Sequence, residues 1–205
     1  MVWSSMSQLS FDWKDPEKRS NRNEEYRHRL FFGFRPSAEA VSESIEIAQS
    51  RQAAHSLTGR LRPHELLHLT LNGIGAYRRL PDDVIFGAAQ VAATVRARSF
   101  ELTLDQTMSF KHQHEPQAFV LSSSWENEAL MYLYKQPREG MYEAGLPYDR
   151  SGHLTPHMTL LYDRKTVPAE RLDRPVRWKV REFLLIHSEY RSSKHQLIGR
   201  WPLLD

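Results

Sequence analysis

The chain has 205 residues, of which 40% are hydrophobic and 11% aromatic, and this length suffices for one globular domain with its own core. The absence of cysteine excludes disulfide bonds and thiolate metal sites. The formal net charge of +3 is mildly basic, which is below that of proteins that wrap nucleic acid but suits a cleft that meets a phosphate. The scattered Arg60, Arg62 and Arg174 are expected to be solvated charges.

The N-terminal segment is polar, mixed in charge and without a sustained hydrophobic period. We expect residues 1–26 to form a leader that is partly disordered, followed by a single domain over residues 27–205. The leader lacks the apolar core of a secretory signal, and no run of about 18 apolar residues predicts a transmembrane helix. These features predict a cytoplasmic protein that does not enter a membrane.

Beyond the leader, short apolar or alternating runs bounded by Gly, Pro, Asn and Asp predict strands. The expected strands span residues 28–34, 66–74, 99–110, 117–124, 157–163, 176–190 and 195–203. Helical spacing of apolar residues predicts helices between them. The expected helices span residues 37–54, 80–97 and 126–136, with Pro137 breaking or kinking the last before a second helical piece that ends at Gly145.

The order of these elements is β-α-β-α-β followed by β-α-β-β-β. We therefore predict an α+β fold that is bilobal, with two pseudo-symmetric lobes, mainly antiparallel sheets facing a central cleft, and helices outside. One four-residue pattern, His-apolar-Thr-Leu, supports the division into halves. It occurs at residues 68–71 and again about 90 residues later, at residues 157–160.

Both copies of the pattern fall in expected strands, where successive side chains point to opposite faces. In each copy the two apolar residues share the core face, while the histidine and the threonine share the opposite face. The residues on that opposite face are His68, Thr70, His157 and Thr159. The same alternation assigns Tyr162 to the core face.

Two imidazoles and two hydroxyls around one cleft suit an in-line displacement at phosphorus without a metal. One neutral ring takes a proton from the nucleophile while one charged ring gives a proton to the leaving group, because the pKa of histidine lies near neutrality. The threonine hydroxyls donate hydrogen bonds to non-bridging phosphate oxygens. We therefore predict that His68, Thr70, His157 and Thr159 are the catalytic residues.

Other residues near these motifs bear on the same chemistry. His153 also begins a His-x-Thr pattern, but it precedes the expected strand and is not assigned to the catalytic pair. His112 and His114 form a His-x-His pair on a predicted loop without other clear ligands, which indicates a solvated loop rather than a metal site. Beside them, Phe110 is expected to stack on a base and Lys111 to pair with a phosphate, so both are expected substrate-binding residues.

The motifs and their flanks resemble the two-histidine phosphoesterases, in the branch of 2'-5' RNA ligases and RNA 2',3'-cyclic phosphodiesterases. The resemblance rests on the segments RLFFGFRPS, HLTLNGIG and TPHMTLLYD and on the ending FLLIHS…GRWPL, and it covers about residues 28–203. It implies a bilobal fold with a central cleft, no metal or cofactor, and the opening of cyclic phosphates. By motif matching it also implies that His157 is the general base and His68 the general acid.

The expected activity is the opening of 2',3'-cyclic phosphates to 2'-phosphates by a monomer whose partners are RNA ends or cyclic nucleotides. Related enzymes also run the reverse joining reaction, so ligase activity is a further expectation. Three alternatives stay open: another cyclic phosphate, such as one on ADP-ribose, an RNA-end-binding module without turnover, and a histidine-based metalloprotein. The intact histidine and threonine pairs argue against the binding module, since binding alone needs no pair of titratable imidazoles.

Overall fold

The protein is described by a computed structural model over residues 25–110, 116–150, 152–192 and 195–205. The expected leader therefore lies almost wholly outside the described residues. Lys111, His112 and His114 also lie outside them, so the expectations for this loop stay predictions.

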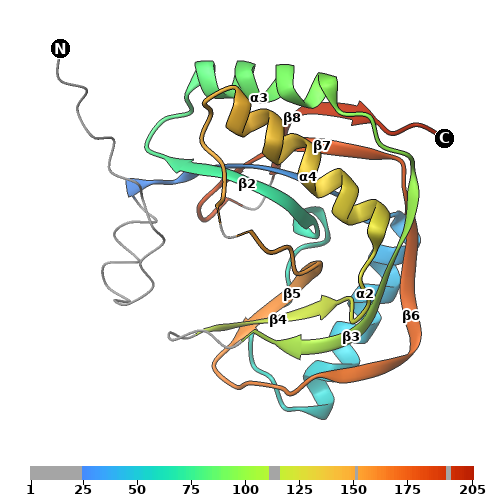
Figure 1. Ribbon diagram of the computed structural model, residues 1–205. Helices are drawn as coiled ribbons and strands as arrows, with labels where there is room; N and C mark the ends of the chain where they lie inside the picture. The colour runs from blue at the N-terminus through green and yellow to red at the C-terminus, as the bar shows by residue number, and fades with distance from the viewer. Residues whose placement is uncertain (1–24, 111–115, 151, 193–194) are drawn as a thin grey trace.

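The described strands follow the order expected from the sequence. They are β1 (His28–Phe34), β2 (Leu69–Tyr77), β3 (Phe100–Ser109), β4 (Gln117–Ser122), β5 (His157–Asp163), β6 (Glu170–Val180), β7 (Glu182–Glu189) and β8 (His195–Pro202). They form one sheet with the order β6-β3-β4-β5-β2-β1-β7-β8, and each neighbouring pair is antiparallel (Figure 1). The predicted α+β class is confirmed, with all eight strands in one hydrogen-bonded order rather than in two separate sheets.

Two four-stranded halves of this sheet meet at a narrow junction. The half β6-β3-β4-β5 is joined to the half β2-β1-β7-β8 through a single registered pair, Leu69 with Met158. Both residues are fully buried in the hydrophobic core. Each is the second residue of a His-x-Thr-Leu tetrapeptide, so the junction brings the two copies of the repeat to the centre of the sheet.

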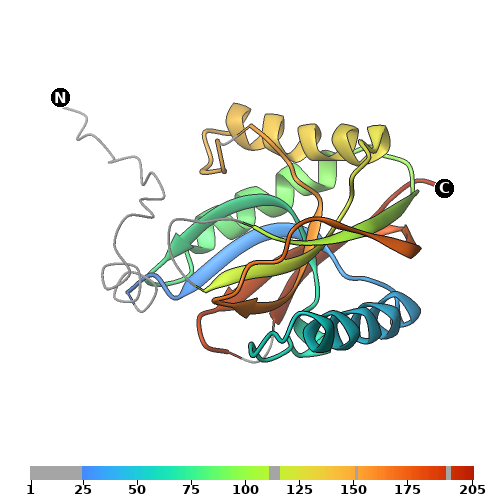
Figure 2. The same ribbon diagram turned by 90° about the horizontal axis from the view of Figure 1, so that it is seen from below.

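Three α-helices cover the described sheet: α2 (Ala38–Ala54), α3 (Asp82–Thr94) and α4 (Glu128–Glu143). α2 begins after Ser37, whose side-chain oxygen accepts a hydrogen bond from the amide of Ala40 at 3.2 Å. Figure 2 shows α3 and α4 on one side of the strands and α2 on the other. Among the helices of the described ranges, none has the length and apolar character needed to cross a membrane.

The expected helix break at Pro137 is wrong, because α4 continues through this residue. Proline removes one backbone hydrogen bond from a helix interior. Pro137 is nevertheless buried, and the helix presents one buried face on both sides of it, formed by Leu130, Leu133, Tyr134 and Met141. The burial of this continuous face compensates for the local cost of the proline.

Several strand boundaries also differ from expectation. β2 begins at Leu69, so His68 lies directly before the strand, and β6 begins at Glu170 rather than at residue 176. β2 continues past Asn72 and Gly73 to Tyr77, because its pairing with β1 continues along that length. The expected strand at 176–190 is two strands, and Arg181 lies between them. β6 pairs with β3 in one half of the sheet, whereas β7 pairs with β1 and β8 in the other half, so the chain changes direction at this residue.

Candidate active site

The two tetrapeptides adopt the same local structure. In β2 the register with β1 skips Leu71, and in β5 the register with β4 skips Leu160, so the fourth residue of each tetrapeptide occupies a β-bulge. Both leucines are buried in the core, as their positions in the pattern predicted. The repeated leucine therefore anchors a bulge directly after each His-x-Thr motif.

The pairing of Leu69 with Met158 sets the relation between the two motifs. His68 and Thr70 flank Leu69 on one chain segment, and His157 and Thr159 flank Met158 on the other, so all four residues adjoin the registered pair. The four expected catalytic residues are thus brought together from two strands that are far apart in the sequence.

The backbone orients both imidazole rings in the same way. Nδ1 of His68 lies 2.7 Å from the carbonyl oxygen of Leu66, and Nδ1 of His157 lies 2.7 Å from that of Thr155. A carbonyl oxygen can only accept, so each Nδ1 carries a proton and donates it. The Nε2 atom of each ring is therefore the nitrogen available for proton transfer.

A cleft of about 340 Å³ opens beside the second motif. Three of the expected site residues, Thr70, Phe110 and His157, line it, whereas His68 and Thr159 do not. The cleft therefore offers space for the part of a substrate that extends from the paired motifs toward Phe110.

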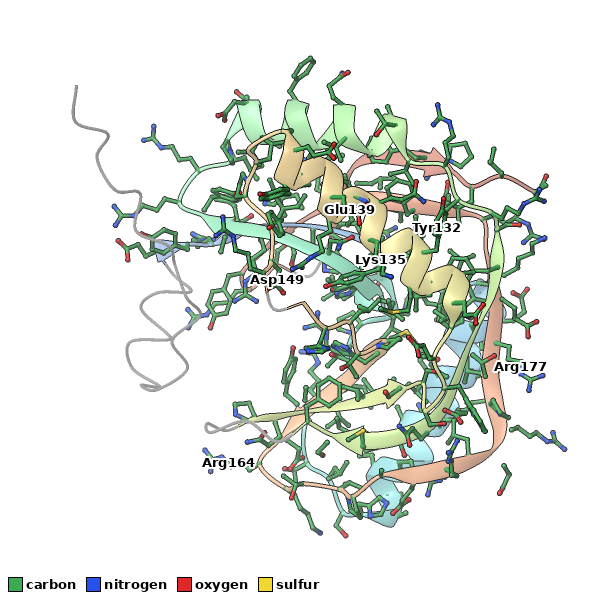
Figure 3. All side chains as sticks on the ribbon, in the orientation of Figure 1. Tyr132, Lys135, Glu139, Asp149, Arg164 and Arg177 are labelled. Atoms are coloured by element: carbon green, nitrogen blue, oxygen red, sulfur yellow. The ribbon has the colours of Figure 1, made fainter. Side chains whose placement is uncertain are left out.

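The segment between α4 and β5 forms another wall of this cleft. Asp149 lies on that segment (Figure 3), and its amide donates to the carbonyl oxygen of Gly73 at 2.8 Å, which ties the segment to β2. His153 precedes β5, as expected, but it is exposed and also lines the cleft. A ligand in the cleft would therefore meet residues of β2, β5 and this connecting segment.

Each of the two motif histidines has a phenylalanine ring against its imidazole. The ring centroids of Phe31 and His68 lie 5.0 Å apart, and those of Phe110 and His157 lie 4.7 Å apart. Phe110 thus lies against the imidazole of His157 and also lines the cleft. Phe31 was not expected in the site, because its sequence context predicts only a buried strand.

A third histidine in the site was missed by the sequence analysis. His195, the first residue of β8, lies edge-on to His68, with ring centroids 4.8 Å apart. Its Nδ1 atom is buried and has no hydrogen-bond partner among the described residues. β8 is separated from β2 by two strands in the sheet and by more than 100 residues in the chain, so no local pattern indicates this contact.

The surroundings of His68 and His195 favour the neutral forms of these two imidazoles. Burial lowers the pKa of His68 to about 4; the hydrogen bond to Leu66 opposes this shift, and nearby cations, Arg62 first, add to it. Burial also lowers the pKa of His195 to about 3, with His68 and Arg62 adding to the shift. A neutral His68 is suited to accept a proton, which is the reverse of the acid role that the family resemblance implies.

The expectation that Tyr162 packs in the core is wrong. The bulge at Leu160 reverses the alternation of β5 beyond it, and Tyr162 is 44% exposed. The guanidinium carbon of Arg62 lies 5.9 Å from the centre of the Tyr162 ring. Arg62 therefore lies between β5 and the first motif rather than among the solvated charges.

The described residues contain no group of three or more His, Cys, Asp or Glu side chains that could hold a metal ion. The His-x-His pair on the loop at 111–115 is not covered by this finding, because it lies outside the described ranges.

The lowered pKa values predict a loss of stability in acid. The unfolded state takes up protons on both histidines as the pH falls below about 6.5, whereas folded His68 and His195 stay neutral until about pH 4 and about pH 3. The free energy of unfolding should therefore fall through this window, by at most about 1.4 kcal/mol per pH unit for each histidine. Urea unfolding at a series of pH values measures this slope.

Carboxylates also titrate in this pH window and contribute to the slope. The variant His195→Phe separates the contribution of His195 from theirs. It keeps a ring against Phe31 and His68 but has no proton to gain. Its stability should depend less steeply on pH than that of the wild-type protein between about pH 6 and 4. Equal slopes for the two proteins would contradict the shift assigned to His195.

Comparisons with known proteins agree with this architecture. The sequence model of the 2'-5' RNA ligase superfamily matches residues 36–192. No match was found among curated proteins.

Solved structures with the same fold include E. coli LigT. In complex with 3'-AMP, LigT has a TM-score of 0.72 and 23% identity, over 87% of this chain and 99% of LigT. LigT in complex with NADP+ has a TM-score of 0.69 and 26% identity, over 87% of this chain and 99% of that one. A Thermus thermophilus protein, TT0787, has a TM-score of 0.64 and 21% identity, over 85% of this chain and 97% of that one.

Proposed function

The chain belongs to the 2'-5' RNA ligase superfamily, and we propose that it is a phosphodiesterase that opens 2',3'-cyclic phosphates on RNA ends or nucleotides to 2'-phosphates. The observation that carries the proposal is the pairing of the two His-x-Thr motifs across β2 and β5. The two motifs provide two imidazoles whose Nδ1 atoms are held by backbone carbonyl oxygens, so that Nε2 can transfer a proton, and each imidazole has a threonine two residues farther along the chain. The family membership supports chemistry at a phosphodiester.

In the proposed reaction, water attacks phosphorus from the side opposite the 3'-oxygen. Neutral His68 takes a proton from the water at Nε2 while the new phosphorus–oxygen bond forms. The bond between phosphorus and the 3'-oxygen breaks, and protonated His157 gives its Nε2 proton to that oxygen. The hydroxyls of Thr70 and Thr159 donate hydrogen bonds to the non-bridging oxygens, where negative charge grows. One water is consumed, and neither a metal nor a cofactor takes part.

The ligand of one relative supports a ribose phosphate as substrate. The LigT complex that matches at 26% identity contains NADP+, and this molecule carries a 2'-phosphate on a ribose, the group that the proposed reaction forms. The cleft beside His157, with Phe110 in its wall, leaves space for the attached base.

The proposal is tested by turnover of a 2',3'-cyclic nucleotide and of a short RNA with a cyclic phosphate end, both in excess EDTA. We expect turnover that resists EDTA and gives only the 2'-phosphate, identified by 31P NMR. A 3'-phosphate product, or loss of turnover with the chelator, would overturn the mechanism. Binding without turnover would favour the RNA-end-binding module, and turnover of ADP-ribose cyclic phosphate alone would favour that substrate. The ligase direction is tested with a second RNA that carries a 5'-hydroxyl.

The pH dependence of kcat/KM should be bell-shaped, because one imidazole must be neutral and the other charged. The rising limb reports loss of the proton from the base, so it should follow the pKa of His68, about 4 in the free protein. Below this pH His68 is protonated and cannot accept. The falling limb reports loss of the proton from His157. A bound anion favours the charged imidazole, so the rising limb of kcat should lie at higher pH than that of kcat/KM. If kcat/KM rose with pH to a plateau while the chemical step was rate-limiting, this result would contradict an acid–base pair formed by His68 and His157.

A further inference from the structure

The chain segment before the first motif is tied along β5. The amides of Thr58 and Gly59 each donate to one carboxylate oxygen of Asp163 at 2.6 Å. Farther along, the amide of Arg62 donates to the carbonyl oxygen of Leu160 at 2.7 Å. These bonds hold the backbone of Arg62 beside the β-bulge that follows the second motif.

Tyr162 provides a surface for the side chain of Arg62. The bulge turns this tyrosine out of the core, and its ring lies 5.9 Å from the guanidinium carbon, within the range of a cation–π contact. The segment can approach so closely because residue 59 is a glycine: an added Cβ would lie 2.0 Å from the carbonyl oxygen of Tyr162. The position of the guanidinium is thus determined by both the backbone and the ring.

The positive charge of Arg62 is not neutralised by an acidic side chain in the described part of the protein. Arg51, by contrast, pairs with Glu170 at 2.5 Å, and Arg171 pairs with Asp105. Arg62 is the arginine with the largest influence on both His68 and His195. The charge of Arg62, which has no acidic partner among the described residues, therefore acts on both imidazoles.

We propose that Arg62 binds a non-bridging oxygen of the phosphate group held at the two-histidine centre, and that Tyr162 positions its guanidinium for this contact. The inference rests on the proposed function for the identity of the reacting group. A guanidinium donates two parallel hydrogen bonds to phosphate oxygens, and it does so best when it is held in place before the ligand arrives. Arg62 would thus add a fixed charge to the hydrogen bonds from the two threonines.

Binding of the phosphate should also change the protonation of His68. In the free protein burial disfavours its charged form most, and the charges of Arg62, His157 and Arg35 add to this effect. A bound anion offsets the charge of Arg62, so His68 should gain proton affinity when phosphate binds. Removal of Arg62 should weaken this coupling.

The test uses Arg62→Met, with Arg60→Met as the matched control, because Arg60 is exposed and lies two residues away in the same segment. Inorganic phosphate is titrated while the imidazole NMR signals of His68 are followed, and turnover of a 2',3'-cyclic nucleotide is measured in parallel. Arg62→Met should weaken phosphate binding about tenfold and lower kcat/KM about 10- to 100-fold, as expected for a lost charged hydrogen bond. Arg60→Met should change neither quantity. Wild-type phosphate affinity and wild-type turnover in Arg62→Met would overturn the inference.

A second variant covers the case in which Arg62→Met does not fold. Arg62→Lys keeps the charge but loses the planar pair of donors, so it should retain phosphate binding and still lose most of the same turnover; wild-type turnover here would also overturn the inference. The experiment distinguishes failure of the inference about Arg62 from failure of the proposed function. Phosphate binding that depends on Arg62, without turnover of any cyclic phosphate, would overturn the proposed function and leave the inference standing.

Discussion

His68→Ala and His157→Ala are each expected to lower kcat/KM for a 2',3'-cyclic nucleotide about 10²- to 10⁴-fold, the usual contribution of a general acid or base. Each variant removes one Nε2 from the pair, and alanine offers no group that can replace it. Their positions at the junction of β2 and β5 predict a local effect, because the core residues there are Leu69 and Met158 rather than the histidines. Steady-state kinetics, with circular dichroism to confirm folding, measure the result.

His64→Ala is the matched control for both histidine variants. His64 lies in the 3-10 turn before β2, is exposed, and contacts Glu65 rather than the paired motifs. This variant should keep wild-type turnover. If either His68→Ala or His157→Ala matched the control on every cyclic phosphate that the wild-type protein opens, the two-histidine mechanism would be wrong.

Thr70→Val and Thr159→Val are each expected to cost about 1–3 kcal/mol of transition-state stabilisation, which corresponds to a loss of about 5- to 150-fold in kcat/KM. Valine keeps the branched shape that suits a strand and removes the hydroxyl that donates to the phosphate. Both threonines flank the registered pair of Leu69 and Met158, and under the proposed function their hydroxyls bind the same phosphate. The loss should appear mainly in kcat, because the charge on the non-bridging oxygens grows in the transition state.

Thr103→Val provides the comparison for the threonine variants. Thr103 is a partly buried strand residue of β3, paired with Arg177 on β6 and away from the two motif strands. It should have wild-type kinetics. A negligible effect in both Thr70→Val and Thr159→Val would mean that these hydroxyls only pack the strands.

The sequence by itself determined the order of the elements and the identity of the paired motifs. Period-two alternation is a local property of a strand, so the faces of His68 and Thr70, and of His157 and Thr159, followed from residue order alone. The cap of α2 at Ser37 was equally local. The occurrence of one motif in each half predicted that the two would meet, but it did not show how.

Only the tertiary structure decided what surrounds the pair. The bulge at Leu160 depends on the register with β4, and it reverses the alternation that had assigned Tyr162 to the core. Pro137 stays within α4 because the buried face of that helix continues past it. Local helix propensity does not include the free energy of burying this face. His195 reaches His68 from β8, a strand that the sequence pattern treats as unrelated. Burial and charge at a site are sums over non-local neighbours, so the lowered pKa of His68 emerged only once the strands were placed in space.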